Sequence, residues 1–188
     1  MLIKTNQYGS MNETYKLLFK TISCYFLMLI SQYVCSQSSE HQLQKQPIQI
    51  VESKDLSKLL PADQTQNKVI ILYVSSPFCR YCRKLEKEIL HPMIKSGDFV
   101  EKSLLRKFVI DSKISILNFK GKKQLPKSLM EEYKVKITPT LLFLDKNGNQ
   151  LSEAIVGFSN DEFYWYYLDT AIERSNQKLK EITIDSGI

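Results

Sequence analysis

The sequence is short of the residues and patterns that mark several common functions. Its 188 residues carry a formal net charge of +6 and include only six glycines, two histidines and four cysteines. Lys and Arg alternate with Asp and Glu along most of the chain, and no five like charges stand together. This pattern is typical of a solvated surface of mixed charge and argues against a nucleic-acid partner. No glycine-rich phosphate loop and no internal repeat are present.

A long hydrophobic run is also lacking. The apolar stretch 22–30 is too short for a comfortable membrane span, which needs roughly 20 residues. Lys16 and Lys20 precede it, and Val34 and Ser36 would stand at the −3 and −1 positions of a cleavage before residue 37. A basic flank, a short apolar core and small residues at the cleavage point predict a secretory signal. An uncleaved anchor that holds the protein at a membrane is the alternative.

The remainder of the chain predicts one domain behind a short spacer. We expect residues 1–36 to be the signal peptide or anchor, 37–47 to be a polar, Gln-rich linker, and 48–188 to be the domain. Removing 1–36 would also remove Cys24 and Cys35, so that only two of the four cysteines remain. One closely spaced pair excludes a structural disulfide framework.

Hydrophobic patterning predicts an α/β domain with a central mixed sheet flanked by helices. The run 68–75 is continuous and β-branched, as in a strand buried on both faces. A helix follows, and its outer face is formed by Arg83, Lys84, Glu86 and Lys87. Pro92 is expected to limit or kink this helix. Further elements are predicted from shorter patterns: a short helix over 52–60, a strand over 104–111, a helix over 128–133, and a hairpin with strands 140–144 and 154–156 before a last helix. Residues 112–126 have no pattern that predicts a helix or a strand.

Cys79 and Cys82 stand where the buried strand gives way to the first helix. The free N–H groups and the positive end of a helix dipole stabilise a thiolate at such a position. Arg80, next to Cys79, adds positive charge, and the two-residue spacing lets Cys82 attack a mixed disulfide on Cys79. The pattern therefore predicts thiol–disulfide exchange, with Cys79 as nucleophile and Cys82, on the apolar helix face, as resolving thiol.

Two other roles for the pair remain open. A disulfide that closes so small a loop would restrain the unfolded chain little, so stability alone is a poor reason for it. A zinc site would need two further ligands, for which the sequence offers His41 and His91. We expect no metal and no cofactor, and keep a protein that binds a metal or partner through its thiols without turnover as the alternative.

Together with this pair, Thr138-Pro139 before the strand 140–144 resembles the thioredoxin superfamily over about residues 48–178. The resemblance implies a thioredoxin fold, a cis-proline at Pro139 that faces the cysteines, and a role for Thr138 and Pro139 in aligning a substrate strand. Within the superfamily, the stretch 75–82 and the hairpin 143–149 look most like exported thioredoxin-like proteins of the SoxW type. The Cys-x-Tyr-Cys form and Thr138 are also similar to the catalytic domains of the DsbC and DsbG isomerases.

The chain departs from the thioredoxin pattern near the cysteines. Arg80 and Tyr81 replace the usual Gly-Pro and are expected to tune the pair. Thioredoxins also bury an aspartate six residues before the first cysteine, where this chain has Tyr73. That carboxylate helps to deprotonate the resolving thiol, and the sequence assigns this role to none of Glu52, Glu86 and Lys107.

From the resemblance we expect a monomeric, extracytoplasmic enzyme, in the periplasm or secreted, that reduces disulfides of exported proteins. Its partners would be protein thiols or disulfides and an upstream redox carrier. A disulfide oxidase or isomerase of the Dsb type, and a cytosolic glutaredoxin-like enzyme, are the alternatives.

Overall fold

A four-stranded mixed sheet forms the centre of the structure, a computed structural model that describes residues 48–60, 68–110, 113–159 and 161–185. These residues belong to one unit, Ile48–Ile188. The predicted signal over 1–36 and the linker over 37–47 lie outside the described residues. Among the described residues, no helix combines the length and the apolar character needed to cross a membrane.

The sheet has the strand order β2-β1-β5-β6. Strand β1 (Val69–Ser75) pairs in parallel with β2 (Ser103–Val109) and antiparallel with β5 (Thr140–Leu144), which in turn pairs antiparallel with β6 (Ile155–Val156). Since the parallel crossover from β1 to β2 carries a helix and the later hairpin adds antiparallel strands, the sequence order dictates this mixed sheet. The predicted α/β fold with a central mixed sheet and flanking helices is confirmed.

Strand β1 lies at the centre and is buried along its whole length. Its side chains alternate between two hydrophobic clusters, because successive residues of a strand point to opposite faces of the sheet. Ile71 and Tyr73 belong to one cluster, and Ile70 and Leu72 belong to the other. A continuous apolar run is therefore required here, as the sequence predicted.

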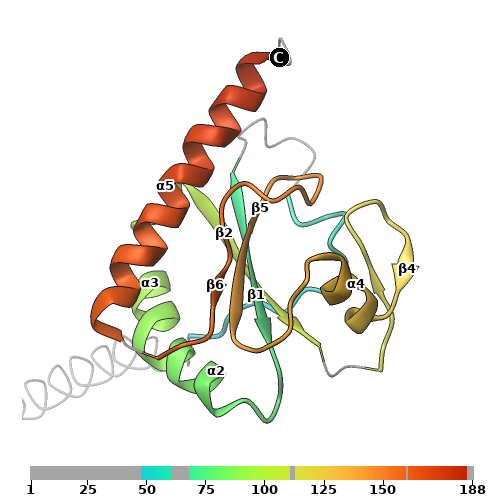
Figure 1. The fold of residues 1–188 in the computed structure, drawn as a ribbon, viewed down its shortest axis with the longest axis horizontal. Helices are drawn as coiled ribbons and strands as arrows, with labels where there is room; N and C mark the ends of the chain where they lie inside the picture. The colour runs from blue at the N-terminus through green and yellow to red at the C-terminus, as the bar shows by residue number, and fades with distance from the viewer. Residues whose placement is uncertain (1–47, 61–67, 111–112, 160, 186–188) are drawn as a thin grey trace, which may run out of the picture. The chain divides into compact units, whose positions relative to one another are not determined.

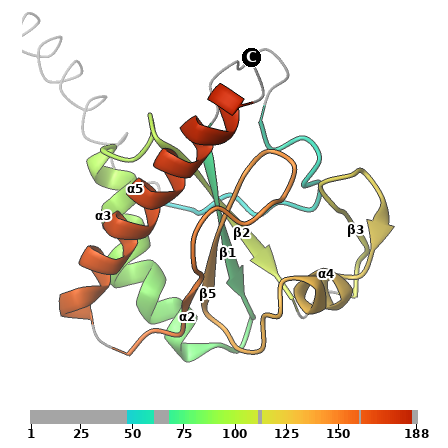
Figure 2. The same cartoon turned by 45° about the horizontal axis from the view of Figure 1, so that its top comes forward.

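One face of the sheet is covered by the helix that follows β1 and by the last helix (Figure 1, Figure 2). The first comprises α2 (Arg80–Leu85), a π-helical turn η1 (Glu86–Leu90) and α3 (His91–Ser96), and the last is α5 (Asp161–Asp185). The sequence predicts that Pro92 limits or kinks the first helix; Pro92 lies in the first turn of α3, directly after the π-helical turn, and does not end the helix. The chain stays helical to Ser96, and the irregularity is the π-helical turn before the proline.

The other face carries α4 (Pro126–Glu132) and the small two-stranded sheet of β3 (Ile116–Leu117) and β4 (Lys123–Gln124). The region 112–126, which the sequence left unplaced, thus contains a hairpin in its described part. Helix α4 begins two residues before the predicted Ser128, because a proline in the first turn is compatible with a helix start.

The helix predicted over Glu52–Leu60 is wrong. The backbone of Val51 and Ser53 bonds instead to both sides of Lys107 in β2, at 2.8 and 2.9 Å, and Asp55 forms a bridge with Leu117. This segment is extended and then turns, and the side chains of its Leu56 and Leu59 are buried in the hydrophobic core. Backbone hydrogen bonds to β2 and to Leu117 therefore decide the local structure, and the helical spacing of the leucines does not.

Candidate active site

Cys79 and Cys82 lie at the point where β1 ends and α2 begins. Cys79 has extended backbone angles and is the N-cap residue of α2, and its Sγ accepts a hydrogen bond of 3.0 Å from the backbone N–H of Cys82. The two sulfurs are joined in a disulfide, with an Sγ–Sγ distance of 2.08 Å. The helix start therefore directs a backbone donor at the sulfur of the first cysteine, as the position in the sequence predicted.

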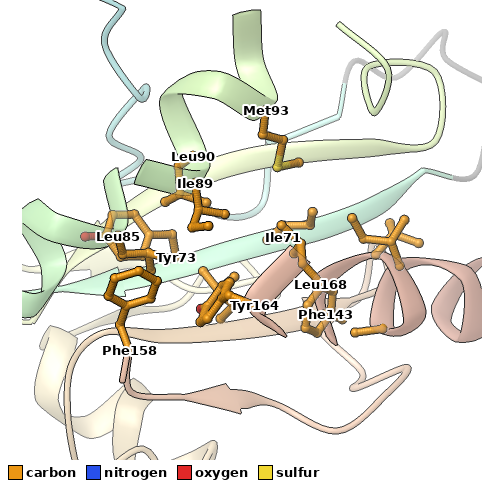
Figure 3. Packing of buried hydrophobic residues seen from close by; sticks show 14 of the residues in the cluster. Ile71, Tyr73, Leu85, Ile89, Leu90, Met93, Phe143, Phe158, Tyr164 and Leu168 are labelled. Atoms are coloured by element: carbon orange, nitrogen blue, oxygen red, sulfur yellow. The ribbon is translucent and has the colours of Figure 1, made fainter. Parts of the chain in front are cut away.

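The two cysteines differ in exposure. Cys79 is half-buried, whereas Cys82 is 1% exposed and belongs to a hydrophobic cluster. Leu85 and Ile89, on the same helix, are members of this cluster (Figure 3). A partner molecule can therefore reach the sulfur of Cys79 but not that of Cys82. This asymmetry matches the roles expected for a nucleophile and a resolving thiol.

The side chains beside the pair are aromatic and exposed. Phe78 is 90% exposed and Tyr81 is 50% exposed. The Arg80 guanidinium lies 5.3 Å from the centroid of the Tyr81 ring, a distance at which a cation is attracted to the ring face. Apolar surface this open next to a reactive pair is suited to contact with another protein.

The Thr138–Pro139 peptide bond is cis. Pro139 directly precedes β5, whose first residue, Thr140, pairs with Val74 near the end of β1. Because β1 and β5 are antiparallel, the start of β5 and the loop that carries Cys79 lie at the same end of the sheet (Figure 1). The fold thus brings Thr138 and Pro139 to the same end of the sheet as the cysteines.

Hydrogen bonding leaves the backbone of Thr138 open. The Pro139 carbonyl accepts a bond of 2.8 Å from the N–H of Gly157, and the Ile137 carbonyl accepts one of 2.8 Å from the Thr140 hydroxyl. In the described part of the chain, no hydrogen bond engages the N–H or the C=O of Thr138. The flanking residues are therefore fixed while these two groups stay free to pair with another strand.

Behind the cysteines, three polar side chains meet that the sequence did not bring together. The Tyr73 hydroxyl lies 3.2 Å from the Cys82 carbonyl and 2.9 Å from Oε1 of Glu86. The same Oε1 accepts a hydrogen bond of 2.7 Å from Nζ of Lys107. Glu86 was predicted to lie on the outer face of the helix, but its side chain is only 20% exposed. It stands four residues after Cys82, and this helical spacing was the signal that could have placed it on the same face.

Burial shifts the acidity of the tyrosines in this region. Tyr73 is fully buried, and desolvation raises its pKa far above the usual value, with further increases from the charge of Glu86. Desolvation also raises the pKa of Tyr164, whose buried hydroxyl has no hydrogen-bond partner in the described part. Both side chains therefore remain neutral hydroxyls over the physiological pH range.

The described residues contain no group of three or more His, Cys, Asp and Glu side chains placed to hold a metal ion. Of the two histidines considered as ligands, His91 begins α3 and His41 lies outside the described residues. A cavity of about 660 Å³ borders β2, and its lining includes Met93, Phe99 and Leu105 but neither cysteine.

Residues 57–172 match a protein-family model described as a thioredoxin-like domain. This match spans more than half of the chain. The chain belongs to the thioredoxin-like family. Membership and the disulfide between Cys79 and Cys82 together support a thiol–disulfide redox function.

Many solved structures are similar, and two of them illustrate the low identity. One is the germline-specific thioredoxin Deadhead of Drosophila melanogaster, with 21% identity over 55% of this chain and 80% of that chain and a TM-score of 0.40. The other is the periplasmic thioredoxin SoxS of Paracoccus pantotrophus, with 18% identity over 57% of this chain and 99% of that chain and a TM-score of 0.41. No curated protein sequence matches the chain.

Proposed function

We propose that this thioredoxin-like protein is an exported thiol–disulfide oxidoreductase that reduces disulfides of other proteins. The observation that carries the proposal is the unequal burial of a bonded Cys-x-x-Cys pair at a helix start: Cys79 is half-buried and Cys82 is 1% exposed. A pair built for stability alone would gain little from so short a loop.

The reaction proceeds in two exchanges. The Cys79 thiolate attacks one sulfur of a substrate disulfide, forms a mixed disulfide, and releases the other substrate sulfur as a thiolate that takes up a proton. The Cys82 thiol then loses its proton and attacks Sγ of Cys79. The bond between Cys79 and the substrate breaks, and the second substrate thiol leaves. Two electrons pass to the substrate, and a dithiol carrier must return two electrons to the Cys79–Cys82 disulfide.

Thr138 and Pro139 would align the substrate. The unpaired N–H and C=O of Thr138 can bond to an extended segment on either side of its cysteine, as an added strand does at a sheet edge. The exposed rings of Phe78 and Tyr81 offer apolar contact to the same segment. Arg80 would tune the pair through its positive charge beside Cys79, and Tyr81 through the ring that attracts the Arg80 guanidinium.

The reducing direction and the export rest on the sequence. The resemblance to exported proteins of the SoxW type favours a reductant, and the apolar run 22–30 with its basic flank favours secretion, with membrane anchoring if the signal is not cleaved. We expect a monomer. An oxidase or isomerase of the Dsb type would use the same two cysteines with electrons flowing the other way or in both directions.

Trapping of the mixed disulfide tests the exchange. We would use the full chain with Cys24→Ser and Cys35→Ser, reduce it, remove the reductant, and add a peptide with one internal disulfide. With Cys82→Ser added, mass spectrometry should find the peptide bound covalently to Cys79, because no resolving thiol remains. The matched variant Cys79→Ser, whose remaining thiol is buried, should bind none. If the Cys82→Ser variant forms no adduct, exchange through Cys79 is wrong.

A further inference from the structure

A buried thiol that must lose a proton needs a base within the protein. Cys82 is 1% exposed, so bulk water does not reach its sulfur. An ordinary thiol has a pKa of about 8.5 and is mostly protonated at neutral pH. The second exchange of the proposed function therefore requires a group behind the cysteines that accepts this proton.

Glu86 is a carboxylate on the same face of the helix as Cys82. The two residues are four apart, a spacing that places side chains one above the other. Tyr73 ties the carboxylate to the turn that carries Cys82, since its hydroxyl lies within hydrogen-bond distance of both the Cys82 carbonyl and Oε1 of Glu86.

The two oxygens of Glu86 are used differently. Oε1 is occupied by the Tyr73 hydroxyl at 2.9 Å and by the Lys107 ammonium at 2.7 Å. Among the described residues, Oε2 has no hydrogen-bond partner. One oxygen thus anchors the carboxylate, and the other retains the lone pairs that a proton acceptor needs.

The charged and titratable groups around Glu86 lie on the neighbouring strands β1 and β2 and on the helices. Tyr73 faces it from β1 and Lys107 from β2, while Ser75 on β1 and Tyr164 on α5 act on Tyr73. Lys107 also lies over the Tyr73 ring, at 5.8 Å from its centroid. Glu52 adjoins Lys107 through a backbone bridge but is exposed, as is Arg83 on α2. Within this set, Glu86 is the half-buried carboxylate that shares a face with Cys82.

We propose that Glu86 is the proton acceptor for Cys82 and that Tyr73 and Lys107 are its positioning residues. This inference rests on the proposed function. In the resolving step the Cys82 thiol proton passes to Oε2 of Glu86, the Cys82 sulfur bonds to Sγ of Cys79, and the bond from Cys79 to the substrate sulfur breaks. The Glu86 carboxyl then gives up this proton, directly or through solvent, to the departing substrate thiolate, which restores the carboxylate.

The test separates the two exchanges with glutathione disulfide as probe. The full chain with Cys24→Ser and Cys35→Ser is reduced and mixed with the probe, samples are quenched with acid, and mass spectrometry follows the glutathione adduct on Cys79. Its formation reports the attack by Cys79, and its disappearance reports the resolving step by Cys82. Both rates are measured from about pH 6 to about pH 9.5, which spans the ordinary thiol pKa.

Glu86→Gln should slow the resolving step at least about tenfold near pH 7, because a positioned general base contributes that much or more. The difference should close toward pH 9.5, where the thiol ionises without help. The rate of adduct formation should change less than about twofold, a difference too small for a group that takes part in that step. Tyr73→Phe should give a smaller slowing with the same pH dependence. Glu88→Gln is the matched control on the same helix, because Glu88 pairs with Lys84 and should leave both rates unchanged.

A purely structural ion pair gives a different result. If Glu86→Gln resolves the adduct with the pH profile of the parent chain, or is slower by the same factor at every pH, the inference is overturned while the proposed function stands. If the parent chain forms no adduct, the proposed function fails and this inference fails with it. Should Glu86→Gln not fold, Glu86→Gln combined with Lys107→Met removes the carboxylate without leaving an unpaired charge, and the same pH profile is expected.

Discussion

The ion pair between Glu86 and Lys107 should be measurable as a coupling energy in the stability of the folded protein. The Oε1–Nζ distance of 2.7 Å corresponds to an attraction of about 6 kcal/mol at an effective dielectric constant of about 20, and about 1.5 kcal/mol in water. The side chains are 20% and 26% exposed, so desolvation and solvent screening offset much of this energy. We therefore expect the two residues to be coupled by about 1–2 kcal/mol.

A double-mutant cycle measures this coupling. Glu86→Gln and Lys107→Met should each destabilise the oxidised protein, and the double variant should lose about 1–2 kcal/mol less than the sum of the two. Urea unfolding followed by the fluorescence of Trp165 is a suitable assay, because this single tryptophan packs against the core cluster on α5. Additive losses, within about 0.3 kcal/mol, would refute the reasoning, since they would mean that the two charges do not interact in solution.

Two further predictions concern the hairpin that follows β5 and its neighbours. Gly148→Ala should lower the free energy of unfolding by about 2 kcal/mol or more, because its φ is +85° and a Cβ would lie 2.6 Å from the Phe119 ring. Gly121→Ala, with φ of +69° and nothing within 4 Å of the added Cβ, should cost only about 1 kcal/mol in the same urea assay; equal losses would contradict the packing argument. Burial raises the pKa of Tyr133 to about 12, so its contribution to stability is complete below about pH 10 and is lost as the pH rises to about 12. Tyr133→Phe should flatten the fall in unfolding free energy over that interval, and an unchanged slope would show that this hydroxyl does not cause it.

The elements that define the fold can be predicted from the sequence because each has a local sequence pattern. The apolar run of β1 requires burial on both faces, and the Asp145-to-Asn149 turn stabilises its own geometry through the Asp145 carboxylate, which accepts the N–H groups of Asn147 and Asn149. The cysteine pair can also be predicted locally, since its chemistry depends on the helix start directly beside it. Local patterns therefore locate Cys79 and Cys82.

The remaining parts depend on contacts between distant segments. Leu56, Leu59 and Leu60 have helical spacing, but the backbone before and at Leu56 bonds to strands more than about 50 residues later, to Lys107 of β2 through Ser53 and to Leu117 of β3 through Leu56. Glu86 and Lys107 stand among many alternating charges. The four-residue spacing from Cys82 is the local signal for Glu86, whereas no one-dimensional pattern sets Lys107 apart from exposed residues. Their sequence separation of 21 residues is bridged only when β2 packs beside β1 and directs Lys107 toward Tyr73.

The reduction potential of the Cys79–Cys82 pair tests the central claim most directly. The full chain with Cys24→Ser and Cys35→Ser would be equilibrated with glutathione buffers, and the fraction of disulfide would be measured after acid quenching. A reductase that needs a dedicated electron supply should give a value below about −230 mV. A value above about −180 mV would contradict the account, because such a protein donates its disulfide to others instead of reducing theirs.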